Sequence, residues 1–162
     1  MSRATEPVSL SSNAIPHVVA VCVSTGGIPK FPVPLARLDE TGFDGDQHAH
    51  DKHNRQDRAV SILDAEVLEQ LIREGFTLCP GAMGENLTVT GLDVQSLEAG
   101  SLLSIGEVVL RLEQPRKPCY VLDTIDPRLK EVVMGRCGYM ASVQRGGAVT
   151  PHMPIRVASC EE

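Results

Sequence analysis

Short apolar runs that end at glycine or proline are the feature that most limits how this chain can fold. Of its 162 residues, 14 are glycine and 11 are proline, and they punctuate most of the sequence. Runs this short suit strands better than helices, and many strands joined by turns are typical of β-barrels. We therefore predict a mainly β fold with α decoration (α+β), a β-barrel with about two short helices. An alternating βαβ parallel sheet is the weaker interpretation, because only two helices are visible in the sequence.

Several strands can be placed along the chain. The Val-rich run over 18–24 predicts a buried strand that ends at Gly26-Gly27. The prolines between 29 and 34 limit the next segment to an edge strand or an extended loop. Two glycine-centred turns predict hairpins, one between 102–105 and 108–112 and one around Gly146-Gly147.

Two segments carry helix signals instead. The first is predicted to start at Asp64, as its cap, and to stop at Gly75. Its apolar side chains repeat at helical spacing, at Val67, Leu68, Leu71 and Ile72. The second is predicted to start at Asp126, with a proline in its first turn, and to stop at Gly135.

We expect one barrel domain over 17–158 between flexible tails at 1–16 and 159–162. The chain is 42% hydrophobic and 22% charged, which argues against a disordered chain. No apolar run approaches the roughly 20 residues of a membrane span, and the start shows no signal-peptide pattern. The net charge of −6 disfavours nucleic acid and anionic membranes as partners. We expect a cytoplasmic protein.

The segment 45–58 carries almost no apolar side chain, so it must form a surface loop or line a wet pocket. Its Asp46 and its histidines, His48, His50 and His53, could bind zinc, which takes three or four such ligands. Their spacing matches no closed structural zinc site, however. Hydrogen bonding to a polar ligand, with Asp46 orienting His48, is the preferred interpretation.

The segment 114–119 offers a thiol beside two cations. Two prolines make it a rigid loop that leaves a strand. The charges of Arg116 and Lys117 favour the thiolate of Cys119, which is both a nucleophile and a soft-metal ligand. The alternative is a thiol packed as a small hydrophobic group. The five cysteines are odd in number and widely spaced, which predicts free thiols, and only Cys137 rivals Cys119.

The segment 81–88 has glycines that let a ligand approach the backbone, among them Gly84. Its polar side chains, Glu85 and Asn86, could select that ligand. A tight turn that enters a strand would explain the same residues. Three arginines could either bind an anion or be solvated surface charges, namely Arg58, Arg136 and Arg145.

In combination, these segments resemble the MOSC domain, a module found at the C-terminus of molybdenum-cofactor sulfurases and as small stand-alone bacterial proteins. The likeness covers about residues 18–157. The matching motifs occur in this order: SxGGIPK at 24–30, GDxH at 45–48, GENL at 84–87, LxxG at 97–100, IGE at 105–107, RKPC at 116–119 and RGG at 145–147. After the last of these the family often has a Gly-Asp pair, where this chain has Thr150–Pro154.

The resemblance implies a β-barrel-rich fold and binding of molybdenum cofactor (molybdopterin), a pterin that carries a phosphate and holds its metal through a dithiolene. It also implies that Cys119 is the functional thiol. Cys119 would be either a sulfur carrier that holds a persulfide or a direct molybdenum ligand in the reduction of N-hydroxylated compounds. The implied pocket residues are Asp46, His48, Gly84, Glu85, Asn86 and Arg116, with Arg58 and Arg136 as phosphate anchors.

The same resemblance bears on partners. The chain is too short for the pyridoxal-phosphate desulfurase domain of the large sulfurases, so a separate cysteine desulfurase would supply the sulfur. No flavin or iron–sulfur motif is visible, so a reductase role would need a molybdoenzyme or an electron-transfer partner. Two alternatives stay open: a non-catalytic module that escorts the cofactor, and a zinc protein that uses His48, His50 and His53.

Overall fold

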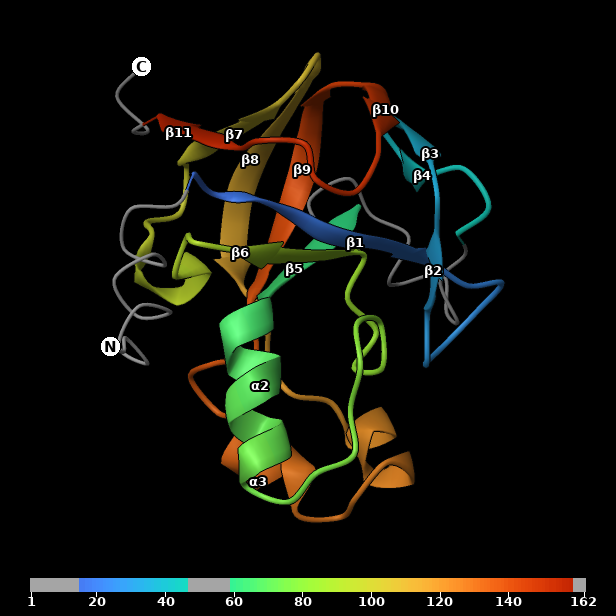
Figure 1. Cartoon of the computed structure of the whole chain (residues 1–162), viewed down its shortest axis with the longest axis vertical. Coiled ribbons are helices and arrows are strands. Elements are labelled where there is room, and N and C mark those ends of the chain that lie inside the picture. Colours follow the sequence, from blue (N-terminus) through green and yellow to red (C-terminus); the bar gives the residue numbers. More distant parts are fainter. Residues whose placement is uncertain (1–14, 47–58, 159–162) are drawn as a thin grey trace, which may run out of the picture.

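The computed structural model describes residues 15–46 and 59–158. Its strands form an eight-stranded sheet in the order β11-β7-β8-β9-β5-β6-β1-β2 and a three-stranded sheet in the order β10-β3-β4 (Figure 1). The strands are β1 (His17–Val23), β2 (Phe31–Val33), β3 (Ala36–Asp39), β4 (Gly42–Phe43), β5 (Val60–Asp64), β6 (Leu87–Thr90), β7 (Leu102–Ile105), β8 (Val108–Pro115), β9 (Tyr139–Arg145), β10 (Gly147–Val149) and β11 (Arg156–Ala158). The helices are α2 (Ala65–Arg73) and α3 (Leu129–Val132), with short 3₁₀ turns η3 (Val94–Ser96) and η4 (Tyr120–Thr124).

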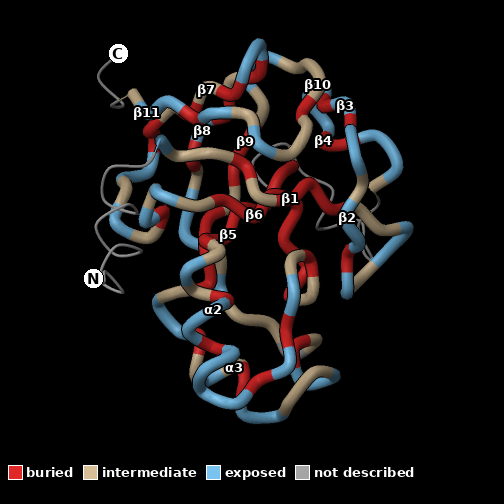
Figure 2. Tube along the Cα trace, in the orientation of Figure 1, coloured by how far each residue is buried: buried red, intermediate tan, exposed pale blue. Residues whose placement is uncertain are grey.

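The large sheet curls into a half-barrel. Val18 N donates to Met153 O (2.9 Å) and His152 N donates to Val18 O (2.7 Å), which ties β1 to the segment just before β11. These two strands lie near opposite ends of the sheet order. Fully buried side chains such as Ile62 and Leu110 fill the apolar core, and Figure 2 shows buried stretches along the central strands. The predicted mainly β architecture, a barrel-like sheet with two short helices, is confirmed.

The two helices lie together below the curled sheet (Figure 1). α2 connects β5 to β6, which is the one parallel pair among the described strands. It buries Leu68 and Leu71, two of the positions whose spacing predicted the helix. These side chains form a second apolar core with others that include Leu63, Met83 and Leu129. None of the helices in the described segments is long and apolar enough to cross a membrane.

Several predicted strands are confirmed. β1 covers the Val-rich run, and β2 lies at an edge of the large sheet, as its prolines require. Two of its residues, Phe31 and Pro32, are exposed. β7 and β8 form the predicted hairpin around Gly106, with Ser104 opposite Val109.

The second predicted hairpin, around Gly146-Gly147, is wrong. β9 and β10 lie in different sheets, because the chain crosses between the sheets at Gly146 and β10 then pairs with β3. A Cβ at Gly146 would lie 2.2 Å from Leu38 O. Glycine therefore serves a close approach between the two sheets here rather than a hairpin turn.

Asp64 ends β5 and is the N-cap residue of α2, as predicted, but its side chain does not cap the helix. Oδ2 accepts a hydrogen bond from Val94 N (2.9 Å) instead, and Oδ1 has no partner within the described residues. Burial raises the pKa of this carboxyl to about 7. Asp64 therefore binds its proton more tightly in the folded protein than in the unfolded chain.

We expect Asp64→Asn to stabilise the protein at pH 8 and to change little near pH 4. Because the folded-state pKa is raised, the folded protein holds a proton that the unfolded chain loses between about pH 4 and pH 7, and wild-type stability falls across that window. The pKa rises from 3.8 to about 7, so at about 1.4 kcal/mol per pKa unit the gain at pH 8 is on the order of 4 kcal/mol. Urea unfolding of both proteins between pH 4 and pH 8 measures the difference in their free energies of unfolding. A difference that does not vary with pH would contradict the prediction.

Candidate functional site

The carboxylate of Asp46 joins three segments that are far apart in the sequence. Its Oδ1 accepts hydrogen bonds from Ser24 N (2.9 Å) and Lys30 Nζ (2.6 Å). Its Oδ2 accepts one from Asn86 Nδ2 (3.0 Å). The side chains of Lys30 and Asp46 are 9% and 3% exposed, so salt screens this ion pair little. Three of the sequence motifs therefore meet at one buried carboxylate.

Asn86 lies where β1, β5 and β6 come together. Its backbone N donates to Ser61 O (3.0 Å), and its backbone O accepts from Cys22 N (2.7 Å). Its side chain repeats the pattern, since Oδ1 accepts from Ser61 N and Nδ2 donates to Cys22 O, both at 3.1 Å. With the contact to Asp46, every polar group of Asn86 has a partner, so this residue holds strand ends together.

Glu85 is completely buried. Its Oε2 accepts hydrogen bonds from Gly81 N (2.8 Å) and Thr88 Oγ1 (2.7 Å), which closes the loop before β6. Its Oε1 has no partner in the part of the chain that the structure describes. Burial raises the pKa of this carboxyl, while its hydrogen bonds and the charge of Arg116 act in the opposite direction. The surroundings of Glu85 therefore favour its neutral form.

Arg116 lies against the same loop. Its backbone N donates to Gly138 O (2.8 Å) and its Nη2 donates to Met83 O (2.6 Å). Its Nη1 is buried and has no hydrogen-bond partner among the described residues. A Cβ on Gly84 would lie 2.5 Å from Ile28 Cγ2 and 3.1 Å from Arg116 Nη2, so this contact needs glycine.

We define the polar cluster as Ser24, Lys30, Asp46, Ser61, Glu85, Asn86, Thr88 and Arg116.

The described thiols differ in accessibility. Cys119 follows Arg116 on the loop that leads into η4 and is partly exposed, and Cys79 is exposed. Cys22 and Cys137 are buried, and burial raises the pKa of Cys22 to about 12 and that of Cys137 above its usual range. Both therefore stay neutral thiols, which disfavours Cys137 as a nucleophile.

Other predicted residues lie elsewhere. The Arg136 guanidinium donates to both carboxylate oxygens of Glu74 (3.0 and 2.8 Å) and to Val132 O (3.1 Å), so it joins the end of α3 to α2 rather than entering the polar cluster. Arg145 Nε donates to Glu107 O. Five residues lie outside the described residues, namely His48, His50, His53, Arg58 and Cys160. Within residues 15–46 and 59–158, no group of three or more His, Cys, Asp or Glu could hold a metal ion.

Some members of the polar cluster were not singled out from the sequence. Lys30 is only 8% exposed, and its place in the SxGGIPK motif was the available signal. Ser61 is a lone polar residue within the apolar start of β5, which is also a usable signal. Thr88 resembles any other strand residue, so nothing in the sequence distinguishes it.

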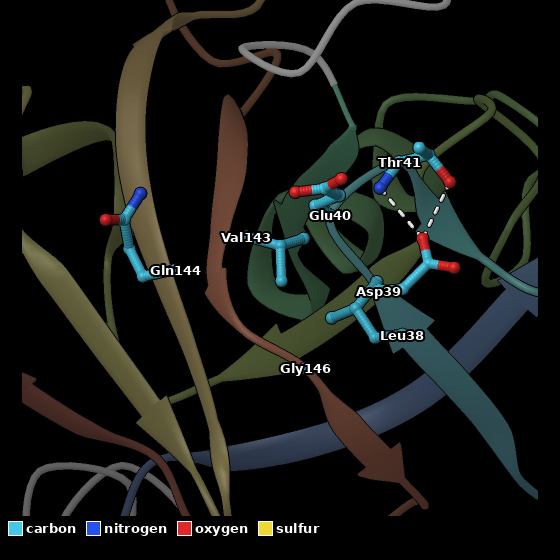
Figure 3. Close-up of a pocket in the computed structure, with 7 residues that line it drawn as sticks. All are labelled: Leu38, Asp39, Glu40, Thr41, Val143, Gln144 and Gly146. Atoms are coloured by element: carbon cyan, nitrogen blue, oxygen red, sulfur yellow. Dashed lines mark hydrogen bonds between the residues drawn. The ribbon is translucent and has the colours of Figure 1, made fainter.

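A separate cavity of about 470 Å³ opens between the β3–β4 turn and β9 (Figure 3). Asp39 at its rim accepts hydrogen bonds from Thr41 N (2.8 Å) and Thr41 Oγ1 (2.6 Å), which lower the pKa of this carboxyl. Glu40 adds a second carboxylate, and no residue of the polar cluster lines the cavity. An acidic rim disfavours a phosphate-bearing ligand, so we place the candidate site at the polar cluster and Cys119 instead.

This chain, with its curled sheet and a partly exposed cysteine on the loop after β8, belongs to the MOSC domain family. The model of the MOSC domain matches residues 49–156. YiiM of Escherichia coli is 31% identical over 131 residues, which cover 75% of this chain and 58% of that protein. YflK of Bacillus subtilis is 32% identical over 143 residues, which cover 82% of this chain and 63% of that protein. The chain thus spans about three fifths of these relatives' length.

Two more comparisons extend this result. A protein of Gibberella moniliformis named as a reductase is 30% identical over 118 residues, which cover 67% of this chain and 21% of that protein. The crystal structure of YiiM from Geobacillus stearothermophilus has a TM-score of 0.73 at 22% identity, over 89% of this chain and 75% of that one. This structural likeness shows the shared fold.

Removing the Asp46 carboxylate should lower the free energy of unfolding by about 3–5 kcal/mol, because it leaves the Lys30 ammonium buried and unpaired. Lys30→Met in the Asp46→Ala protein should recover part of that loss. The matched control is Asp126→Ala, which breaks a surface ion pair to Arg128 with side chains 24% and 68% exposed, and which should cost much less than the loss of the Asp46 carboxylate. Urea unfolding compares the variants, and equal losses at the two sites would contradict this account.

Iodoacetamide should modify Cys79 and Cys119 in the folded protein and spare Cys22 and Cys137, because alkylation needs an accessible thiolate. Peptide mass spectrometry after a short exposure measures each site, with the protein unfolded in urea as the reference. Modification of Cys137 as fast as that of Cys119 would restore Cys137 as a rival.

Proposed function

We propose that this protein binds molybdenum cofactor and uses Cys119 either to carry sulfur to it or to ligate its molybdenum. Membership of the MOSC family supports the choice of cofactor. The observation that carries the residue assignment is the shared loop of Cys119 and Arg116. It places a partly exposed thiol on the same short loop as a buried guanidinium nitrogen that no group in the described segments engages.

The residues present fit such a cofactor. Arg116 Nη1 is a charged donor suited to a phosphate oxygen, and guanidinium pairs with phosphate are among the strong hydrogen bonds of proteins. Gly84 keeps the loop beside Arg116 free of a side chain. Cys119 offers the kind of sulfur ligand that soft metal centres prefer. When bound, the cofactor would supply a redox-active metal, and the chain would hold and orient it.

Binding and support fall to different residues in this proposal. Arg116 and Cys119 contact the ligand, whereas the hydrogen-bonding groups of Asp46 and Asn86 are engaged within the protein. Arg136 is a weaker choice as a phosphate anchor, because Glu74 already binds its guanidinium. The roles of His48 and Arg58 rest on the resemblance alone.

In the sulfur-carrier version, the thiolate of Cys119 attacks the terminal sulfur of a persulfide on a separate cysteine desulfurase. A new S–S bond forms at Cys119, the S–S bond of the donor breaks, and the donor cysteine leaves as a thiolate. The exchange consumes no external oxidant or reductant. Cys119 then holds the sulfur that is passed on to the cofactor.

In the ligand version, Cys119 would hold the molybdenum, and the cofactor would supply the redox chemistry for the reduction of an N-hydroxylated compound. The overall reaction takes up two electrons and two protons, breaks the N–O bond and releases the oxygen as water. The electrons would come from a separate electron-transfer protein. The similarity to a named reductase is the observation that supports this version, although the match covers only 21% of that protein.

Cys119→Ala should reduce the bound molybdenum or sulfur by roughly tenfold or more, as removal of groups around a metal does. Cys79→Ala removes the other accessible described thiol and should change neither amount. Elemental analysis of protein made with molybdate in a cofactor-producing host measures molybdenum. Intact mass after incubation with a cysteine desulfurase and cysteine measures added sulfur.

The pattern of loss separates the two versions. Molybdenum present in the parent and missing from Cys119→Ala supports ligation, whereas one added sulfur atom that is missing from the variant supports sulfur carriage. Pterin bound equally by both proteins, with no loss of molybdenum or sulfur loading, would overturn the role of Cys119 and leave the cofactor-escort alternative.

A further inference from the structure

The turn before β6 is closed by internal hydrogen bonds around Gly81. Gly81 N donates to Glu85 Oε2 (2.8 Å), and Gly81 O accepts from Gly84 N (3.0 Å) and Lys30 N (2.8 Å). Gly81 has a φ of +89°, and a Cβ there would lie 2.2 Å from Lys30 O, so only glycine fits. Thr88 Oγ1 holds the same Glu85 oxygen from the strand side (2.7 Å). The carboxyl of Glu85 therefore ties the start of the turn to β6.

The carbonyl that holds Arg116 belongs to this closed turn. Met83 lies between Gly81 and Glu85, and its O accepts from Arg116 Nη2 at 2.6 Å. The bonds that Glu85 makes therefore act together with the backbone hydrogen bonds of Gly81 O to set the position of this carbonyl. Gly138 O holds the backbone of Arg116 from the other side (2.8 Å). Both ends of a long, flexible side chain are thus fixed by the protein itself.

We propose that Glu85 is a positioning residue for Arg116. It holds the turn over 81–85 so that Met83 O binds one guanidinium nitrogen and Nη1 is directed as the donor for an anionic group. The inference rests on the proposed function only for the identity of that group. Glu85 acts through the turn rather than on the ligand, since its Oε2 is engaged by Gly81 N and Thr88 Oγ1.

A fixed guanidinium has a clear advantage for binding. Arginine has many rotamers, and a ligand that must immobilise such a side chain binds more weakly. The planar fork of arginine has a set geometry, so fixing Nη2 also fixes the direction of Nη1. A turn that holds Arg116 before the ligand arrives therefore prepares the site in advance.

The chemistry of Glu85 identifies a discriminating variant. Oε2 accepts both hydrogen bonds, and burial raises the pKa of this carboxyl. Glutamine offers the same carbonyl acceptor, with an NH₂ group in place of the second oxygen and no charge. Glu85→Gln should therefore preserve the turn, whereas Glu85→Ala removes the tie.

The test follows the Arg116 side chain by ¹⁵N NMR of the full chain, with its signals identified by their loss in Arg116→Lys. In Glu85→Ala the Nη hydrogens should exchange with water roughly tenfold faster or more, because a local tie is lost. Glu85→Gln should match the wild type. The matched control is Glu66→Ala, since Glu66 Oε2 also accepts from a threonine hydroxyl and a glycine N–H, those of Thr90 and Gly91, but lies outside the polar cluster.

Unchanged Arg116 exchange in Glu85→Ala, or the same quickening in Glu66→Ala, would overturn the inference. If Glu85→Ala does not fold, Thr88→Val removes one of the two donors to Glu85 and should quicken Arg116 exchange in a folded protein. Pterin content after expression in a cofactor-producing host tests the proposed function separately. Full pterin content in Arg116→Lys would refute binding by Arg116, while the NMR result would still decide whether Glu85 positions it.

Discussion

The carboxylate of Asp46 is the contact on which the arrangement of the candidate site depends. Ser24, Lys30 and Asn86 all donate hydrogen bonds to it. The contact thus joins three segments, the loop over 24–30, the loop at Asp46 and the residue just before β6, and Asp46 itself lies in no strand of either sheet. A buried carboxylate is costly without its donors, so this contact couples the three segments energetically. The apolar cores hold the sheet and the helices, whereas the loops around the polar cluster are held by charge and hydrogen bonds.

Buried polar groups in this region fall into two kinds. Those of Asn86 are all partnered, which makes it part of the framework. Arg116 Nη1 is instead buried with no partner in the described ranges, and such a group is costly unless something binds it. Glu85 Oε1 also has no partner in the described ranges, but only Arg116 carries the positive charge that suits an anionic ligand. The sequence motifs contain both partnered and unpartnered polar residues, and the sequence alone does not distinguish the two.

What the sequence could predict follows from how local each signal is. The buried strand β1, the edge strand β2 and the hairpin of β7 and β8 depend on neighbouring residues, and they were predicted correctly. The local sequence at Gly146 is typical of a hairpin turn. In the fold, Gly146 instead packs closely against the carbonyl of Leu38, which is far away in the sequence. Likewise, Asp46, Glu85, Asn86 and Arg116 could be named from their motifs, whereas their hydrogen-bond partners depend on contacts between segments far apart in the sequence. Accessibility, which separates Cys119 from Cys137, is also set only by the packed fold.

The prolines in and just after the edge strand β2 have a consequence for self-association. An open sheet edge normally offers a row of N–H and C=O groups to which another chain can add a strand. Pro32 and Pro34 carry no N–H, so this edge cannot offer a complete ladder. Phe31 is 62% exposed at the same edge, which is the kind of side chain that would otherwise promote aggregation. These prolines therefore disfavour the addition of a strand from another chain at the edge where Phe31 meets water.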